Sequence, residues 1–523
     1  MIKLKIDGKE IIVAEGTSVL NAAKTLGIEI PTMCYLEGAG FHNHPSCMVC
    51  LVKDENSGKL LPSCALPAAE NMNIITSDQE VMNARKDALE LLMSDHVGDC
   101  EAPCTLGCPA DMNIPMMNRL IAQGKFAEAI EVVKEEIALP HILGYICPAP
   151  CEKVCRRNSV DKPVQICQLK KFVAAEDIRG NHTFFPEKQT KSGKKVAITG
   201  SGPAGLAAAF YLLKAGHTCT IFDKNELAGG SLRYLKLDKP LPIEVLDSEI
   251  NYLKIYGAEF KLNTNIDSAF INQHIKSSFD AIILATGAID QVNFKIDGLE
   301  SNDKGIIINP NTFETSIPGL YACGSAVKSL KMAVRSVAQG KDTAHSVDQF
   351  LRGEQVVKAP KMFNSKFGKL AEEEIEEYLK ESINKAIENK VYEGLDPYQI
   401  AEAQTEANRC MHCDCRKIAN CKLRIHSDAY QIDRRKYLLG ERNQLSKHFK
   451  QDMIVYEPEK CIKCGLCVEI TSKHKEEFGL TFIGRGFDVR IKVPFGKSME
   501  EALTSTAIEC ANACPTGAIS LID

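Results

Sequence analysis

Cysteine is the residue through which this sequence suggests chemistry. The chain of 523 residues contains 22 cysteines, and most of them stand in short, regularly spaced groups. Thiolates at such spacings are ligands for zinc or for iron–sulfur clusters. The N-terminal segment MIKLKIDGKE lacks the apolar core of a secretory signal. We therefore expect a reducing cytoplasm, where clustered cysteines bind metal more often than they form disulfides.

The first group has the spacing C-x12-C-x2-C-x13-C. Three cysteines stand on one loop and the fourth follows a hairpin-like segment: Cys34, Cys47, Cys50 and Cys64. A small sheet domain encloses a [2Fe–2S] cluster in this way, and a tetrahedral zinc site is the alternative. The spacing, with CMVCLV ahead of a predicted strand, resembles the ferredoxin domain that opens the large iron–sulfur subunit of respiratory NADH dehydrogenase and the iron-only hydrogenases. That resemblance implies a β-grasp fold and a [2Fe–2S] cluster.

A second group of cysteines lies in a helix-rich region within SDHVGDCEAPCTLGCPADMNIP, GYICPAPCEKVC and KPVQICQLKKF. The second and third segments resemble the N-terminal iron–sulfur domain of the glutamate synthase small subunit and of dihydropyrimidine dehydrogenase. The resemblance implies two [4Fe–4S] clusters with interleaved ligands. One set would be Cys100, Cys104 and Cys155, and the other would be Cys108, Cys147 and Cys151. Each set lacks one ligand.

Two residues can complete these sets. His96 precedes Cys100 in an H-x3-C pattern, which resembles the histidine-ligated cluster of the respiratory subunit; a surface histidine is the alternative. For the other set, the related proteins have Glu or Gln where this chain has Lys170, which cannot ligate while charged. Cys167 lies three residues earlier on the same predicted helix face and can replace it, unless it is a buried structural cysteine.

A glycine motif predicts a dinucleotide site. Gly200, Gly202 and Gly205 lie between the apolar strand KKVAIT and the helix LAAAFYLLKAG. Such glycines permit the tight turn, the close approach of pyrophosphate and the packing of the helix. Asp223 ends the next strand, CTIFD, at the distance expected of a ribose-binding acid.

Further motifs favour FAD over NAD at this site. They are AGGSLRY, AIILATGA and IPGLYACGSA, which contribute Gly230, Arg233, Gly287, Gly324 and Ser325. Together with the glycine turn they resemble the FAD domain of the glutamate synthase small subunit. Two departures stand out: the NADPH-binding second Rossmann unit of those proteins is missing, and Ser325 replaces an aspartate. An empty fold that only spaces the clusters is the alternative.

The C-terminal third contains two more cysteine groups. The dense segment RCMHCDCRKIANC predicts a [4Fe–4S] cluster, with zinc as the alternative, on Cys410, Cys413, Cys415 and Cys421. The last group resembles a two-cluster ferredoxin that has lost one cluster, because Thr471, Thr504 and Ala507 replace cysteines. The remaining cluster would be bound by Cys461, Cys464, Cys467 and Cys514. Three cysteines are left over, namely Cys219, Cys323 and Cys510.

The elements that position these residues predict a multidomain α/β and α+β protein. We expect a β-grasp [2Fe–2S] domain at 1–80, a helical domain with two [4Fe–4S] clusters at 81–188, and a Rossmann-like FAD domain at 189–355. A helical segment with a cysteine-rich [4Fe–4S] motif would follow at 356–445, beginning with a charged helix from Lys366 to about Asn389. A ferredoxin-like domain at 446–523 would complete the chain.

Composition excludes some functions and leaves electron transfer. The net charge of −5 offers no basic field for nucleic acid, and no apolar run is long enough to cross a membrane. Clusters at both ends of the chain indicate an electron-transfer subunit of a soluble oxidoreductase complex with one [2Fe–2S], four [4Fe–4S] and FAD. The resemblances imply as partners an FMN- and NAD-binding subunit, a small [2Fe–2S] subunit, and a catalytic hydrogenase, formate or aldehyde oxidoreductase, or ferredoxin. Such modules also occur in electron-bifurcating complexes. The alternatives are a self-sufficient NAD(P)H:acceptor oxidoreductase and a glutamate-synthase-like small subunit.

Overall fold

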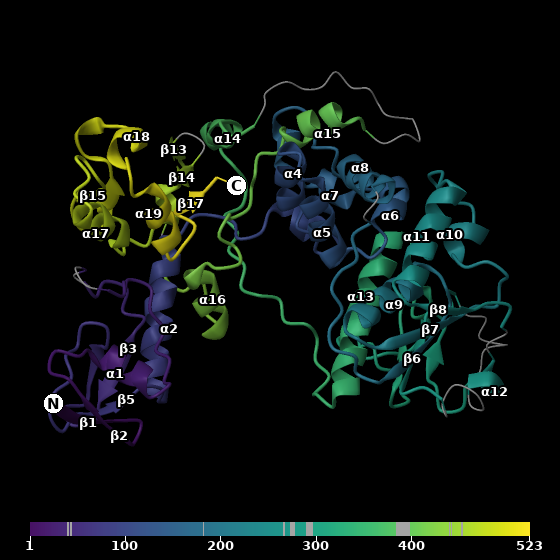
Figure 1. Ribbon diagram of the computed structural model, residues 1–523, viewed down its shortest axis with the longest axis horizontal. Coiled ribbons are helices and arrows are strands. Elements are labelled where there is room, and N and C mark those ends of the chain that lie inside the picture. The colour runs from purple at the N-terminus through teal and green to yellow at the C-terminus, as the bar shows by residue number, and fades with distance from the viewer. Residues whose placement is uncertain are drawn as a thin grey trace. The chain divides into compact units, whose positions relative to one another are not determined.

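The computed structural model describes residues 1–522 except 39–40, 42–43, 181–182, 265–266, 272–277, 289–295, 383–397, 439, 441 and 451–452. The chain divides into two compact units, each made of separate stretches. Unit 1 comprises Met1–Glu101, Lys361–Lys380 and Cys413–Asp523, and unit 2 comprises Ala102–Pro360 and Glu381–His412. Unit 2 is therefore inserted into the sequence of unit 1. In Figure 1, unit 1 is mainly purple and yellow, and unit 2 runs from blue through teal to green.

Unit 1 begins with a mixed five-stranded sheet in the order β2-β1-β5-β3-β4. Its strands are β1 (Ile2–Ile6), β2 (Lys9–Val13), β3 (Leu51–Asp54), β4 (Lys59–Pro62) and β5 (Asn73–Ile75). Leu4 and Ile6 are buried while the lysines between them face solvent, as expected of a strand with one covered face. Asp7 and Gly8 both have positive φ and join β1 to β2 in a tight hairpin.

Two helices accompany this sheet. Helix α1 (Val19–Thr25) is capped by Ser18, whose hydroxyl accepts from the N–H of Asn21 at 3.2 Å. Helix α2 (Gln79–Ser94) begins at Asp78, whose carboxylate accepts from the N–H of Val81 at 2.8 Å. The capping side chains of Ser18 and Asp78 explain where the two helices start.

The C-terminal part of unit 1 is a small α+β module. Its three-stranded sheet has the order β13-β14-β17, formed by β13 (His448–Lys450), β14 (Ile454–Tyr456) and β17 (Ile519–Leu521). A separate hairpin pairs β15 (Thr481–Ile483) with β16 (Arg490–Lys492). The helices of this part and of the preceding segment are α14 (Glu372–Leu379), α16 (Lys422–Ala429), α17 (Leu466–Lys473), α18 (Met499–Ala502) and α19 (Ala507–Ala513).

Helix α14 is shorter than the predicted helix from Lys366 to about Asn389. It begins at Glu372 because Gly368, with φ +94°, lies in a turn conformation, and the N–H of Ala371 donates to the Glu374 carboxylate at 2.9 Å. Residues Lys366–Leu370 are not helical. The part of the prediction from residue 383 to Asn389 lies outside the described residues.

Unit 2 contains a helical region and a parallel sheet. The helices of the first region are α3 (Pro103–Gly107), α4 (Ile114–Ala122), α5 (Phe126–Glu136), α6 (Pro140–Ile146), α7 (Pro150–Lys153) and α8 (Ile166–Arg179), joined by α15 (Ile400–Ala407) from the end of the insertion. Helix α15 packs on α4 and α8. The N–H of Gln165 donates to the buried Glu406 carboxylate at 2.9 Å, which ties α15 to the start of α8.

The parallel sheet has the order β12-β9-β6-β7-β8. Its strands are β6 (Lys195–Thr199), β7 (Thr218–Phe222), β8 (Glu259–Lys261), β9 (Ala281–Leu284) and β12 (Leu320–Ala322). The associated helices are α9 (Pro203–Lys214), α10 (Ser231–Tyr234), α11 (Ile243–Ile255), α12 (Ser268–Phe270) and α13 (Ala333–Arg352). Strands β6, β7 and β9 are almost wholly apolar, as parallel strands covered on both faces must be.

The stretch between β9 and β12 is short. Its described residues, 285–288 and 296–319, contain turns and a two-residue hairpin of β10 (Ser301–Asn302) with β11 (Gly305–Ile306). No βαβ unit occurs in this described stretch. The protein as described is thus a mixed α/β structure.

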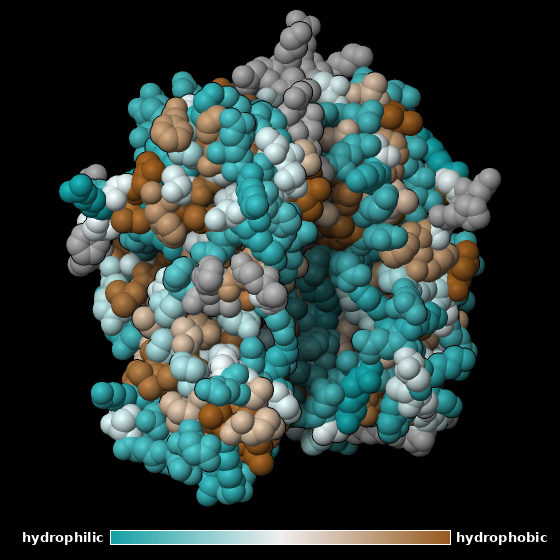
Figure 2. Space-filling view, turned by 60° about the vertical axis from the view of Figure 1, so that its left-hand side comes forward, coloured by the Kyte–Doolittle hydropathy of each residue, from teal (hydrophilic) through white to brown (hydrophobic). Residues whose placement is uncertain are grey.

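None of the described helices is both long enough and apolar enough to cross a membrane. On the face drawn in Figure 2, hydrophobic residues form small separate spots among hydrophilic ones.

Candidate redox sites

The four N-terminal cysteines come together in unit 1. Cys34 and Cys47 have their sulfur atoms 3.3 Å apart, and all four thiols are buried. Cys50 and Cys64 stand at the two ends of the β3–β4 hairpin, where the Ser63 N–H donates to the Cys50 carbonyl at 3.1 Å. A hydrogen bond from Cys64 lowers the pKa of Cys50 to about 7. These residues fit a metal–thiolate cluster, because four buried thiols gather in one place.

The C-terminal group is arranged around the turn between β14 and α17. Lys463 (φ +58°) and Gly465 (φ +78°) coil the segment from Cys461 to Cys467. The N–H of Lys463 donates to the Cys461 sulfur at 3.3 Å, and the N–H of Ile519 donates to the Cys514 sulfur at 3.4 Å. Backbone donors to sulfur are one of the features that set iron–sulfur potentials.

The residues that replace cysteines in this module have structural roles. The buried Thr471 hydroxyl donates to the Val468 carbonyl at 3.0 Å and accepts from the Leu480 N–H at 3.2 Å. Thr504 donates through its hydroxyl to Glu476 at 2.5 Å. Cys510 is fully buried, and its sulfur lies 3.9 Å from the Cys467 carbonyl oxygen.

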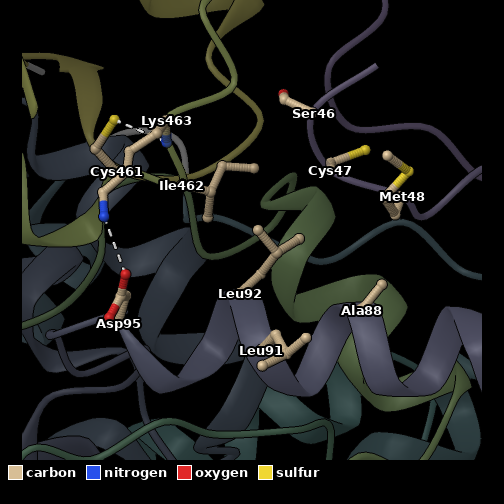
Figure 3. Close-up of a pocket in the computed structure, with 10 residues that line it drawn as sticks. All are labelled: Ser46, Cys47, Met48, Ala88, Leu91, Leu92, Asp95, Cys461, Ile462 and Lys463. Atoms are coloured by element: carbon tan, nitrogen blue, oxygen red, sulfur yellow. Dashed lines mark hydrogen bonds and ion pairs between the residues drawn. The ribbon is translucent and has the colours of Figure 1, made fainter. Parts of the chain in front are cut away.

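The N-terminal and C-terminal cysteine groups share an apolar core and a cavity. The core contains Cys34, Cys47, Cys421 and Ile462, with Cys464 packed against it. The cavity has a volume of about 230 Å³. Figure 3 shows Cys47 and Met48 on one side of it, Cys461 and Lys463 on the other, and residues of α2 between them.

A third group in unit 1 joins cysteines that are distant in sequence. The N–H of Cys415 donates to the Cys100 carbonyl at 3.1 Å, and Cys421 lies within electrostatic range of both sulfurs. Burial raises the pKa of Cys100 to about 11 and that of Cys421 to about 12. His96 is near: its Nδ1 lies 3.3 Å from the Lys460 carbonyl oxygen, and burial lowers its pKa to about 4, so that it is neutral.

The predicted partners of Cys100 belong to unit 2. Cys104 and Cys155 lie in the helical region of unit 2, whereas Cys100 belongs to unit 1. Within unit 2, Cys155 is an electrostatic neighbour of Cys410, and the Asn118 side chain hydrogen-bonds the Cys410 thiol. Cys413 is the first residue of the last stretch of unit 1. The described structure therefore divides the predicted group of Cys410, Cys413, Cys415 and Cys421 between the units.

The other helical set does come together in unit 2. Cys147 and Cys167 are hydrogen-bonded, as are Cys167 and Cys151, and Cys108 lies beside them. Lys170 lies beside this group, with its Nζ 3.9 Å from the Cys167 sulfur. Burial lowers the pKa of Lys170, but the surrounding cysteines raise it to a net value above the ordinary one, so that this lysine is a fixed buried cation. Cys167, which was predicted as the fourth ligand, is thus placed beside the other three.

The glycine turn leaves room for a phosphate group at one position. A Cβ added at Gly202 would meet no atom within 4 Å, whereas one at Gly205 would lie 2.0 Å from the Gly200 carbonyl oxygen. Gly200 has φ +105°. Gly202 therefore faces open space at the start of α9, where N–H groups point outward, and Gly205 is required by packing. The buried Thr286 hydroxyl, beside Gly287 at the end of β9, has no hydrogen-bond partner among the described residues, so a bound group can use it.

The polar residues around the turn are already engaged. Asp223 accepts from the N–H of Ser201 at 2.8 Å and from its hydroxyl at 2.5 Å, so in this state it holds the turn. Arg233 donates to the Ala228 carbonyl at 2.8 Å and pairs with Asp247. A Cβ at Gly230 would lie 2.8 Å from the Cα of Gly202, which fixes this loop over the turn.

The closing motif also packs on the glycine turn. Gly324 has φ +67°, and a Cβ there would lie 2.8 Å from that of Ala204. The Gly324 N–H donates to the Gln339 side-chain oxygen at 2.9 Å, and Ser325 follows in a short 3₁₀ turn, partly exposed. Cys219 and Cys323 are fully buried in the sheet region, and burial raises the pKa of Cys323 to about 12, which makes it unreactive.

Two functional candidates were not evident from the sequence as such. Lys460 is buried beside the Cys100 group and pairs with Glu457 at 2.6 Å, yet nothing in its sequence context distinguishes it from a surface lysine. Thr286 lies inside the ATGA motif, and that motif was the only signal for it. No group of three described His, Cys, Asp or Glu residues is arranged around one ion position; a cluster spreads its ligands over several irons.

Comparison with known families assigns three segments. Residues 1–79 match the 2Fe-2S iron-sulfur cluster binding domain, and residues 76–181 match dihydropyrimidine dehydrogenase domain II, 4Fe-4S cluster. Residues 198–259 match the NAD(P)-binding Rossmann-like domain. These matches confirm the predicted resemblance to dihydropyrimidine dehydrogenase.

Known proteins are similar over part of the chain. The NADP(+)-dependent formate dehydrogenase subunit beta of Moorella thermoacetica is 34% identical over 227 residues, 39% of this chain and 32% of that protein. The NADPH-Fe(3+) oxidoreductase subunit beta of Geobacter sulfurreducens is 36% identical, with 39% and 30% covered. The glutamate synthase [NADPH] small chain of Bacillus subtilis is 37% identical, with 39% and 41% covered.

The chain thus spans less than half the length of these relatives. The predicted resemblance to the glutamate synthase small subunit is confirmed. By its matched segments and relatives, the chain is a homologue of oxidoreductase subunits that combines a [2Fe–2S] domain, a [4Fe–4S] domain and an NAD(P)-binding Rossmann-like domain.

Proposed function

We propose that this chain is an electron-transfer subunit of a multi-subunit oxidoreductase complex. It would relay electrons between an NAD(H)- and FMN-binding subunit and a catalytic hydrogenase, formate or aldehyde oxidoreductase, or ferredoxin. The proposal includes one [2Fe–2S] cluster, four [4Fe–4S] clusters, FAD and a cytoplasmic location. Iron–sulfur clusters transfer single electrons, and a flavin exchanges electrons singly or in pairs. The names of two relatives, subunits of a formate dehydrogenase and of an NADPH-Fe(3+) oxidoreductase, support this proposal.

The observation that carries the proposal is the apolar core shared by three cysteine groups of unit 1. Cys34 and Cys47 come from the N-terminal group, Cys421 from the middle group, and Cys464 from the C-terminal group. A shared core places these cysteine groups a short distance apart. Electron transfer needs such proximity, whereas isolated structural zinc sites do not.

The finer domain assignments belong to this proposal. The mixed five-stranded sheet with α1 supports a β-grasp ferredoxin domain, and the C-terminal sheet with α17 and α19 supports a ferredoxin-like module with one cluster. We retain the five sequence ranges as functional segments within the two compact units. Electron bifurcation is an extension of the relay that the flavin would make possible.

FAD is the dinucleotide we propose for the Rossmann-like domain. The open space at Gly202 and the unpartnered Thr286 hydroxyl support a bound dinucleotide. The choice of FAD rests on the surrounding motifs, which contain Arg233 and Ser325. An NAD(P) site at residues 198–259 is the second candidate, since the matched family is described as NAD(P)-binding. In that case the chain would oxidise NAD(P)H by itself.

An anaerobic titration of the isolated, iron-replete chain separates these functions. Extracted flavin is quantified first, and NADH and then NADPH are added while the visible flavin band is followed. We expect bound FAD that ignores both nucleotides and bleaches when a low-potential reductant reduces the clusters. Rapid bleaching by either nucleotide would overturn the relay and establish the oxidoreductase alternative.

One variant, compared with the wild-type chain, controls for flavin content. Gly202→Ala adds a methyl group into the open space of the turn, so we expect loss of bound flavin, unchanged cluster absorption and unchanged unfolding. Ser201 and its contact with Asp223 stay intact in this variant. A wild-type chain that purifies with iron but never with flavin, even after reconstitution with FAD, would favour the empty scaffold.

A further inference from the structure

We propose that Cys100, Cys415 and Cys421, together with His96, form a single [4Fe–4S] site in unit 1 that the insertion of unit 2 splits in the sequence. This inference rests on the proposed iron–sulfur function and concerns which residues share a site. It differs from the sequence-based grouping, in which Cys100 joins Cys104 and Cys155, and Cys415 and Cys421 join Cys410 and Cys413.

The backbone around Cys100 is joined directly to the segment that follows the insertion. Cys100 accepts through its carbonyl from the N–H of Cys415 at 3.1 Å. Its own N–H donates to the Ser365 carbonyl at 3.1 Å, and the Ser365 N–H donates to the Cys100 sulfur at 3.4 Å. Unit 2 begins after Glu101, and its last stretch ends at His412. The hydrogen bond between Cys100 and Cys415 therefore joins the parts of unit 1 that come before and after unit 2 in the sequence.

Cys415 and Cys421 are held against the C-terminal module. A Cβ at Gly517 would lie 2.3 Å from the Cys415 sulfur, so only glycine allows this thiol its position. Cys421 stands at the start of α16, and the next N–H, that of Lys422, donates to the Pro515 carbonyl at 2.9 Å. Both thiols are buried, and the charges of Cys415, Cys100 and, with the smallest effect, Cys514 act on the Cys421 thiol.

His96 presents a nitrogen suited to be the fourth ligand. Its Nδ1 lies 3.3 Å from the Lys460 carbonyl oxygen, and a carbonyl can only accept. The proton of the neutral ring must therefore be on Nδ1, and the lone pair is left on Nε2. Metal-binding histidines are commonly oriented by such a backbone carbonyl. The adjacent N–H of Val97 donates to the Glu459 carbonyl at 2.8 Å, which fixes the segment.

A buried lysine supports the same site. Lys460 is 2% exposed and pairs with Glu457, and its side chain packs against Gly98, where a Cβ would lie 2.8 Å from it. Cys415 acts on Lys460 through its charge. Lys170 has the corresponding place beside the Cys108, Cys147, Cys151 and Cys167 group. A cation beside a set of thiolates offsets their negative charge. The Cys100 group and the Cys167 group therefore each have a buried lysine that compensates part of the thiolate charge.

The proposal is tested by electron paramagnetic resonance of the reduced full-length protein, with iron analysis. We expect Cys100→Ser, Cys415→Ser and Cys421→Ser each to abolish the same [4Fe–4S] signal and to remove about four iron atoms. Cys104→Ser and Cys155→Ser are expected to leave that signal intact and to abolish another. Cys510→Ser, at a buried cysteine outside the proposed sets, is the matched control and is expected to change neither the signals nor the iron content.

Conservative variants protect the test against misfolding. Aspartate can keep a ligand at the site, so Cys100→Asp and Cys415→Asp are expected to shift the g values of one and the same signal without loss of iron. His96→Cys should shift that signal too and lower its midpoint potential, because thiolate is more negative than imidazole.

The contrary result is equally clear. If Cys100→Asp and Cys104→Asp altered one signal while Cys415→Asp altered a different one, the split site would be refuted and the sequence-based grouping restored. A reduced wild-type protein with no [4Fe–4S] signal at all would instead refute the proposed function, on which this inference rests.

Discussion

Lys170 shows how a single residue can set the properties of a redox site. It is 3% exposed, and its Nζ lies 3.9 Å from the Cys167 sulfur. A buried cation stabilises the more negative, reduced form of a cluster. We therefore expect Lys170→Met to lower the midpoint potential of one [4Fe–4S] cluster by on the order of 100 mV, given ~4 kcal/mol for a charge pair at this distance and ~59 mV per tenfold change for one electron.

Redox titration followed by electron paramagnetic resonance measures this shift. Lys171→Met is the control, because the neighbouring ammonium is also buried but lies over the Tyr145 ring at 4.1 Å. An unchanged potential in Lys170→Met, or equal shifts in both variants, would contradict the assigned role of Lys170.

Glu249 gives unit 2 a pH-dependent stability. Its buried carboxyl accepts from the N–H groups of His141 and Ile142 at 2.8 and 2.9 Å, with Lys134 and Lys170 as the nearest opposite charges. Burial raises the pKa of Glu249 to about 7, against ~4.3 in an unfolded chain. The folded state binds more protons between these values. The contribution of Glu249 is therefore fully present below ~4.3 and is lost as the pH rises through about 7, at up to ~1.4 kcal/mol per pH unit.

Glu249→Gln removes this dependence, because the amide stays neutral and keeps an acceptor oxygen. We expect the denaturant midpoint of the variant, relative to the wild type, to be higher at pH 8 than at pH 5.5. Glu244→Gln, at an exposed position of the same helix α11, should give parallel pH profiles for variant and wild type. Equal pH profiles for Glu249→Gln and the wild type would rule out a titrating Glu249.

At the scale of elements, the contact between α9 and α13 depends on Gly340. A Cβ at this position would lie 2.3 Å from the Ala204 carbonyl oxygen. Helix propensity alone favours alanine over glycine by ~1 kcal/mol, whereas overpacking costs ~1–3 kcal/mol. The backbone cannot give way as a flexible side chain would, so we expect Gly340→Ala to lower the free energy of unfolding of unit 2 by up to about 2 kcal/mol.

Denaturant unfolding of the anaerobic protein tests this balance of effects. His345→Ala, at an exposed position of α13, reports the helix propensity without the clash and is expected to be neutral or slightly stabilising. A Gly340→Ala variant as stable as His345→Ala would show that α9 and α13 can move apart to accept the added methyl group without loss of unfolding free energy.

At the scale of the whole molecule, the cysteine groups are part of the cores of both units. Cys34, Cys47 and Cys421 belong to a core of unit 1, and the core of unit 2 includes Cys108, Cys147, Cys151 and Cys167. Removal of iron would leave buried thiols facing one another without the metal that they bind. Metal binding is coupled to folding in such sites, so we expect chelation to destabilise both units by several kcal/mol.

Tyrosine fluorescence and far-ultraviolet circular dichroism can follow this change, since the chain has 13 tyrosines and no tryptophan. Reconstitution with iron and sulfide should restore the original transitions. Unfolding transitions that are the same with and without iron would mean that the thiols pack as ordinary apolar residues.

Several elements could be predicted from local sequence alone. Local sequence explains the β1–β2 hairpin, where Asp7 and Gly8 both have positive φ in the tight turn, and the start of α1, which Ser18 caps. The start of α14 at Glu372 was missed, since the charged pattern from Lys366 onward continues through Gly368 without a change of period. Periodicity does not show where a turn conformation interrupts a helix.

The sequence by itself determined the kinds of site in this protein: cysteine groups at metal-binding spacing and a glycine turn for a dinucleotide. Both kinds of site follow from residue type and short sequence spacing, because residues that are close in the chain also lie close together in the folded protein. Only the tertiary structure decided which cysteines meet. Cys100 lies next to Cys415 although the two are far apart in the chain, because both belong to unit 1 and unit 2 is inserted between them, whereas Cys104 belongs to unit 2. The burial of Lys460 and Lys170 was likewise visible only in the tertiary structure. Desolvation of a charge depends on the residues packed around it, and many of these are distant in the sequence.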